Sequence, residues 1–165
     1  HGTTLSGLMQ AHGIDPHDFL AFVHDVEMDA LVEDARLVRA VAALPGRKLI
    51  FTNGDAAYAR RVLSRLGLGE SFETIHDIHA CAYQPKPNPL SYAAMCETLR
   101  IDPTRALFVE DMARNLVPAK ALGMVTVWVN NGSEDGDRGV DRAAIDYEIA
   151  EVGAWLEQIL QGETE

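Results

Sequence analysis

The hydrophobic pattern of the chain changes character near residue 45. Before that point apolar residues recur with the period of helices that bury one face. Three helices are predicted there, at residues 3–11, 18–31 and 34–44. The third carries its leucines and valines on a single stripe, and Pro45-Gly46 ends it. The start of the chain is therefore predicted to be a helical unit without strands.

After residue 47 the apolar residues gather into short runs between turn residues, a pattern typical of buried strands. Strands are predicted at residues 48–52, 72–78, 106–109 and 124–129, with a short fifth strand at 145–149. Asp55 and Asn88 are predicted N-caps of helices between them, and a last helix is predicted at 151–160. The alternation of strands and helices predicts an α/β fold with a doubly wound parallel sheet.

Charge and composition narrow the range of partners. The 165 residues carry a formal net charge of −11, which would repel a phosphate backbone, so no nucleic-acid partner is expected. Cys81 and Cys96 are too few for a disulfide scaffold and indicate a reducing, cytoplasmic setting. No apolar run approaches membrane-spanning length, so no membrane partner is expected. The oligomeric state stays open between monomer and homodimer.

Polar side chains follow two of the predicted strands at their carboxyl ends. Thr52, Asn53 and Gly54 come directly after the first apolar run. The third run ends abruptly in Glu110 and Asp111. Open parallel sheets bind ligands beyond the carboxyl ends of their strands, so these groups are expected to converge on one rim.

A lysine in a proline-rich loop completes a set that suits phosphoryl chemistry. The Thr52 hydroxyl and the backbone amides after it are donors for phosphate oxygens. Lys86 can neutralise phosphate charge and hold a nucleophilic carboxylate in place. Asp111 offers a hard oxygen ligand for Mg2+, and Glu110 is either a second ligand or the holder of a metal-bound water. Taken singly, each residue also has an ordinary interpretation as a turn residue, a surface charge or a helix cap.

The residues around these groups resemble the motifs of a known superfamily. Residues 52–54, Lys86 within QPKPNP, and Glu110-Asp111 within VEDMARNLVPAKALGM are similar to motifs II, III and IV of the haloacid dehalogenase superfamily. HGTTLSGL at the start and DYEIAEVGAWL near the end resemble its pyrimidine 5′-nucleotidase-like branch, whose members hydrolyse phosphate monoesters. The resemblance implies a Mg2+-dependent phosphatase for a small-molecule phosphate ester, with nucleoside monophosphates as candidate substrates.

The resemblance also implies roles for individual residues. It assigns phosphate binding to residues 52–54, and it pairs Lys86 with both the phosphate and the nucleophile. Asp111 would bind Mg2+. Asn115 would support the metal-binding loop without itself touching the metal.

The resemblance further implies a domain division and a missing segment. Residues 1–35 resemble the C-terminal half of a helical cap, and residues 36–165 resemble a Rossmannoid core. In the family, the core begins with a strand that ends in D-x-D-x-T. The first aspartate of that motif attacks phosphorus to form an aspartyl-phosphate, and the second acts as general acid and base. No D-x-D-x-T occurs in these 165 residues.

The missing motif leads to an expectation about the chain itself. In the family its strand lies between those that correspond to 48–52 and 106–109. Without that strand, buried backbone groups would be left unpaired at a cost of about 1–3 kcal/mol each. We therefore expect the native protein to be longer, with the nucleophile upstream, and we expect this chain alone to be inactive.

Two other functions stay open. A 2-haloacid dehalogenase would share the fold but needs no metal, and the acid pair favours the Mg2+-dependent alternative. If the protein natively lacks the nucleophile, the favoured interpretation is a phosphate-binding module without catalytic activity. His76 and His79 lack a third ligand for a metal and are interpreted as structural or surface groups. The histidines on the predicted cap are candidates for substrate contact: His1, His12, His17 and His24.

Overall fold

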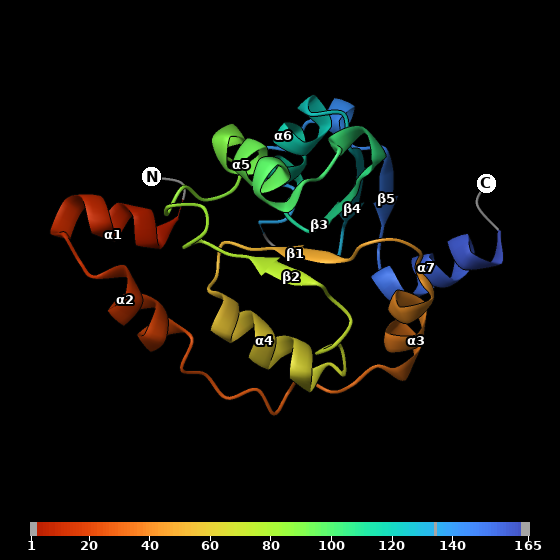
Figure 1. Cartoon of the computed structure of the whole chain (residues 1–165), viewed down its shortest axis with the longest axis horizontal. Helices are drawn as coiled ribbons and strands as arrows, with labels where there is room; N and C mark the ends of the chain where they lie inside the picture. Colours follow the sequence, from red (N-terminus) through yellow and green to blue (C-terminus); the bar gives the residue numbers. More distant parts are fainter. Residues whose placement is uncertain (1–2, 134, 163–165) are drawn as a thin grey trace. The chain divides into compact units, whose positions relative to one another are not determined.

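The chain forms two compact units, His1–Pro85 and Lys86–Glu165, and each is described by itself (Figure 1). Their boundary falls in the proline-rich loop. The predicted boundary near residue 35, between a partial cap and a core, is a different division and stays a prediction. The structure is a computed structural model that describes residues 3–133 and 135–162.

The described part of the first unit combines helices with one pair of parallel strands. Its helices are α1 (Thr4–His12), α2 (Pro16–Val23), α3 (Ala35–Ala43) and α4 (Ala56–Arg65). Its strands are β1 (Leu49–Phe51) and β2 (Thr74–His76). Ile50 pairs with Ile75 in the parallel ladder, and α4 forms the crossover between the two strands. This is the strand–helix–strand order that the sequence predicted.

Helix α2 is shorter than predicted. It ends at Val23, and residues 24–34 contain no helix. Arg61 of α4 donates to the backbone oxygens of His24 and Val26, at 3.0 and 3.1 Å. These carbonyl groups therefore find their donors on another helix, and a continued α2 is not needed to satisfy them. The local apolar pattern predicted a helix through residue 31, but hydrogen bonds from α4 hold this segment in a non-helical conformation.

The second unit contains a three-stranded parallel sheet in the order β3-β4-β5 (Figure 1). Its strands are β3 (Leu107–Glu110), β4 (Val125–Val129) and β5 (Tyr147–Ile149). Its helices are α5 (Pro89–Leu99), α6 (Leu116–Ala121) and α7 (Val152–Gln161). Short 3-10 turns are η1 (Pro103–Arg105), η2 (Ala113–Asn115) and η3 (Arg142–Ala144). The register sets Glu110 at the end of β3 beside Trp128 of β4.

The parallel pairing within both sheets confirms the predicted α/β fold class. The two predicted N-caps, Asp55 and Asn88, are confirmed as well. Asp55 Oδ1 accepts from the Tyr58 amide at 2.7 Å and caps α4. Asn88 Oδ1 accepts from the Leu90 amide at 3.0 Å and caps α5, whose first residue is proline. Both caps satisfy amide groups that have no partner inside the helix.

Each unit buries its own apolar cluster. In the first unit Leu5 of α1, Leu20 of α2 and Ile78 after β2 are buried together. The buried residues of the cluster in the second unit are Ala113, Leu116 and Trp128. Ala113 of the second cluster belongs to the segment that follows β3, so the core of this unit also anchors that segment.

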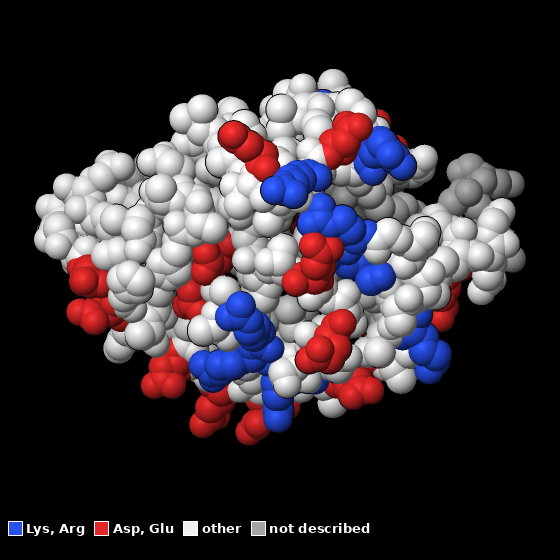
Figure 2. Space-filling model, viewed as in Figure 1, with Lys and Arg blue, Asp and Glu red and all other residues white. Residues whose placement is uncertain are grey.

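Charged side chains of both signs are interspersed on the face shown in Figure 2. Exposed ion pairs join Arg47 to Glu73 in the first unit and Arg142 to Glu148 in the second. Such exposed pairs contribute little to stability, so the buried clusters carry most of it. None of the helices in the described ranges is long and apolar enough to cross a membrane.

Candidate active site

Residues 52–54, here called the threonine loop, form a tight turn directly after β1. The Thr52 amide donates to the His76 carbonyl at 3.0 Å, and the Thr52 hydroxyl oxygen accepts from the Gly54 amide, also at 3.0 Å. The Gly54 carbonyl accepts from the Ile78 amide at 3.2 Å. The loop is thus fixed to the ends of both strands. Because the hydroxyl oxygen accepts within the loop, its proton stays available for a further acceptor.

Asp55, which follows the threonine loop, binds a histidine from the segment after α2. Its Oδ2 lies 2.5 Å from His24 Nδ1. Burial by itself raises the pKa of Asp55, but hydrogen bonds from the Tyr58 amide and from His24 outweigh it and lower the pKa. Asp55 is therefore an acceptor at neutral pH, and His24 Nδ1 is the donor. The His24 ring also stacks on the Tyr58 ring, with centroids 4.1 Å apart.

His76 at the end of β2 is a core group. It is buried, and its Nε2 has no hydrogen-bond partner within the described residues. Burial lowers the pKa of His76, and the neighbouring Asp77 opposes that shift only in part. The imidazole is therefore neutral at pH 7, which fits the structural interpretation of His76.

The other histidines form no metal site in the described chain. His17 and His79 stack with centroids 4.6 Å apart, and the Tyr83 hydroxyl lies 3.0 Å from His79 Nδ1. Within the ranges that the structure covers, no group of three or more His, Cys, Asp or Glu residues is placed to hold a metal ion. His1, also a candidate for substrate contact, lies outside the described residues.

In the second unit Lys86 is paired with Glu110 at the end of β3. The Lys86 ammonium donates to Glu110 Oε2 at 2.5 Å, and the two side chains are 10% and 7% exposed. The ammonium also lies 5.7 Å from the centre of the Phe108 ring. Glu110 Oε1 accepts from the Met112 amide at 3.3 Å. Both oxygens of Glu110 are engaged, which favours a role in holding Lys86, while its predicted role as a metal ligand stays a prediction.

Residues 110–115, here called the acidic loop, are held mainly through their backbone. Trp128 Nε1 donates to the Asp111 carbonyl at 2.9 Å, and the Ala113 amide donates to the Gly136 carbonyl at 2.9 Å. A Cβ on Gly136 would stand 3.3 Å from the Asp111 carbonyl, so the two segments are in close contact. Asp111 itself is exposed. Its backbone is therefore fixed while its carboxylate stays accessible to a ligand.

Asn115 closes the acidic loop and is 5% exposed. Its amide donates to the Met112 carbonyl at 2.8 Å, and its carbonyl accepts from the Tyr92 hydroxyl at 2.6 Å. Its side-chain oxygen Oδ1 has no hydrogen-bond partner in the part of the chain that the structure describes. A buried oxygen without a donor costs about 1–3 kcal/mol. In native proteins such an atom often serves a bound ion or ordered water.

The predicted site residues are thus divided between the two units. Those that belong to the second unit are Lys86, Glu110, Asp111 and Asn115. Those that belong to the first unit are Thr52, Asn53 and Gly54. That the two groups surround one phosphate stays a prediction.

Sequence reasoning missed the side chains that position these groups. Trp128 is a buried core residue whose indole also holds the acidic loop. Asp55 was predicted only as a helix cap. Its contact with His24 spans 31 residues, and no local pattern signals such a pairing.

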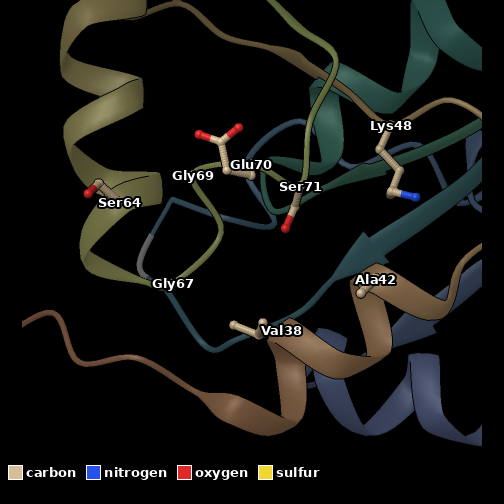
Figure 3. Close-up of a pocket in the computed structure, with 8 residues that line it drawn as sticks. All are labelled: Val38, Ala42, Lys48, Ser64, Gly67, Gly69, Glu70 and Ser71. Carbon is tan, nitrogen blue, oxygen red and sulfur yellow. The ribbon is translucent and has the colours of Figure 1, made fainter.

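A hollow of about 670 Å3 lies at the other end of β1 (Figure 3). Its lining residues are Val38, Ala42, Lys48, Ser64, Gly67, Gly69, Glu70 and Ser71. Lys48, which precedes β1, has its ammonium bonded to the Leu44 carbonyl at 3.0 Å. Ligands of parallel α/β folds bind at the carboxyl ends of the strands, so we place the site at the threonine loop and not in this hollow.

Both sheets are parallel, and polar groups follow a strand of each: a hydroxyl after β1, and acids at the end of β3. Parallel α/β folds bind their ligands at such strand ends. The model of the haloacid dehalogenase-like hydrolase family matches residues 10–123. The chain belongs to this family of hydrolases, as the motif resemblance predicted.

Known relatives include phosphatases. The chain is 30% identical over 121 residues to the phosphoglycolate phosphatase of Rhodospirillum rubrum, covering 73% of this chain and 50% of the relative. It is similar to the crystal structure of a HAD phosphatase from Thermococcus onnurineus, with a TM-score of 0.62, 25% identity, and coverage of 96% of this chain and 71% of the other.

An L-2-haloacid dehalogenase from Xanthobacter autotrophicus is also similar in structure. The TM-score is 0.59 at 20% identity, with coverage of 76% of this chain and 59% of the other. This likeness concerns the fold alone. The chain spans at most half the length of the first curated relatives it matches, so the activity of the whole protein is a matter for proposal.

Proposed function

We propose that the protein hydrolyses phosphate monoesters with the help of Mg2+. The observation that carries this proposal is the end of β3, where the buried Lys86–Glu110 pair adjoins the accessible carboxylate of Asp111. A phosphate dianion needs both positive charge and donors in a site from which water is largely excluded. Lys86 supplies a fixed positive charge there.

The acidic loop fits a magnesium ion. Mg2+ is usually held by one or two carboxylates, together with substrate phosphate and water. Asp111 offers such a carboxylate on a fixed backbone. The buried Oδ1 of Asn115 is a further acceptor that suits a metal-bound water. When bound, the ion would neutralise charge that develops on the phosphoryl oxygens.

The proposed route also needs a nucleophile. By resemblance this is the first aspartate of a D-x-D-x-T motif, and the motif does not occur among the 165 residues. We therefore propose the aspartyl-phosphate route for a protein in which a segment with that motif accompanies this chain. Lys86 would then orient the attacking carboxylate, and Glu110 would hold Lys86 in place.

A screen of phosphate esters tests this function. We expect the protein, with its nucleophile segment, to release phosphate from some member of a panel of nucleoside 5′-monophosphates, sugar phosphates and phosphoglycolate. Activity should require Mg2+ and disappear with chelator. Asp111→Asn should raise the Mg2+ concentration needed for half-maximal activity by about 10-fold or more, because a carboxylate ligand is lost.

A matched control separates this effect from a general change of charge. Asp137→Asn removes an exposed carboxylate from the same unit and should leave the Mg2+ dependence unchanged. An equal effect of both replacements would contradict the role of Asp111.

The pyrimidine 5′-nucleotidase-like resemblance makes nucleoside monophosphates the first substrates to try. A dehalogenase is the second candidate, because 2-haloacid dehalogenases share this fold. Release of halide from 2-haloacids, unaffected by chelator and without phosphatase activity, would establish that alternative.

A further inference from the structure

The imidazole of His24 is held from two sides beside the threonine loop. Asp55 Oδ2 binds its Nδ1 at 2.5 Å, and the Tyr58 ring lies parallel to it at 8° between ring planes. The side chains of His24 and Asp55 are 17% and 15% exposed. A histidine restrained at one nitrogen and stacked on one face has a defined direction for its other nitrogen.

That direction is toward the threonine loop. The point at which a Cβ on Gly54 would stand lies 3.6 Å from His24 Cε1 and 3.7 Å from His24 Nε2. The same point lies 3.5 Å from the Thr52 hydroxyl oxygen. The free edge of the imidazole and the hydroxyl therefore approach the same side of Gly54.

The backbone of His24 is fixed as firmly as its ring. Its amide donates to the Leu20 carbonyl at 3.0 Å and so ends α2, while its carbonyl accepts from Arg61 at 3.0 Å. The carboxylate of Asp55 thus orients the ring, and Arg61 holds the backbone that carries it. The arrangement matches that of imidazoles whose second nitrogen has a ligand, with the first nitrogen oriented by a carboxylate.

We propose that His24 is a substrate-binding residue whose Nε2 donates a hydrogen bond to a phosphoryl oxygen of the monoester bound at the threonine loop. The ligand chemistry is that of a phosphate dianion, because the Thr52 hydroxyl can donate on the same side and an imidazole that donates from Nδ1 to Asp55 and from Nε2 to the ligand suits an anion. Asp55 acts as the positioning residue for His24. This inference rests on the proposed function, since it names a further contact of that site.

Two replacements of His24 test the proposal in the protein with its nucleophile segment. Asparagine at 24 keeps a donor for Asp55 but does not reach the position of Nε2, whereas glutamine reaches it. We expect His24→Asn to raise both the KM for the monoester and the inhibition constant of inorganic phosphate by about 10-fold, as for the loss of one charge-assisted hydrogen bond. His24→Gln should retain most of the affinity.

The control is Arg39→Gln, which removes an exposed cation from α3 of the same unit and should leave both constants unchanged. An inhibition constant of phosphate within about twofold of wild type in His24→Asn would overturn the proposal. Equal weakening by asparagine and glutamine would show that a donor at the position of Nε2 makes no difference, and it would overturn the proposal as well.

A measurement on the wild type covers the case in which the variants fail to fold. With 15N-labelled histidine, saturation with inorganic phosphate should shift the Nε2 signal of His24, and an unmoved signal overturns the inference. Failure of the proposed function would give a different result from failure of this inference. In that case no monoester is hydrolysed, while phosphate still binds and still shifts Nε2.

Discussion

The ammonium of Lys86 donates to Oε2 of Glu110 at 2.5 Å, and both side chains are about nine-tenths buried. Removing one partner of a buried pair leaves the other charge without compensation. We therefore expect Lys86→Met to lower the free energy of unfolding by about 3–5 kcal/mol in urea denaturation. The double replacement Lys86→Met with Glu110→Gln should lose less than the lysine replacement alone.

An exposed ion pair provides the comparison for this experiment. Arg47 and Glu73 form a bonded pair with side chains 45% and 52% exposed. Arg47→Met should change the free energy of unfolding far less, because solvent screens the pair. A loss as large as that of Lys86→Met would contradict the argument from burial.

The indole of Trp128 is predicted to stabilise the acidic loop. Trp128→Phe keeps a large ring but deletes the donor to the Asp111 carbonyl. The free energy of unfolding should fall by about 1 kcal/mol, the typical value of one such hydrogen bond. The concentration of Mg2+ needed for half-maximal activity should rise. Trp155→Phe, on α7, is the control and should leave the Mg2+ dependence unchanged.

His76 should make the protein less stable on mild acidification. Burial lowers its pKa in the folded state below the ordinary value of 6.5, so the unfolded chain takes up a proton first as the pH falls. The free energy of unfolding should therefore be unaffected by His76 above pH 6.5. It should decrease as the pH falls from 6.5 to the lowered pKa of the folded state. His76→Leu should flatten this part of the stability profile measured by urea denaturation. The exposed-histidine replacement His12→Asn should not.

Ionised Asp146 should contribute to the free energy of unfolding, and this contribution should be lost at low pH. Hydrogen bonds from the Lys120 ammonium and the Thr126 amide lower the pKa of Asp146 below its ordinary value of 3.8. A carboxyl with a lowered folded-state pKa contributes stability that is present above 3.8 and lost as the pH falls through the lowered value. Asp146→Asn should therefore reduce stability at pH 7 and flatten the profile below about pH 4. A profile like that of wild type would contradict the assignment.

The sequence by itself determined the class of fold and the strand ends at which candidate site residues lie, such as Thr52 after β1 and Glu110 at the end of β3. Asp55 and Asn88 cap the helices for which they were predicted, and the strands pair in parallel. Caps, turns and strand runs are set by interactions between residues a few positions apart, so a local pattern is sufficient to predict them.

Only the tertiary structure decided which side chains hold one another. The end of α2 at Val23 depends on Arg61, and the pairing of Lys86 with Glu110 spans 24 residues. The contact of His24 with Asp55 spans 31 residues. A local pattern carries no information about a partner that far along the chain, because packing of the whole unit selects it. The helix boundary and the polar pairs of the site were therefore beyond prediction from the sequence.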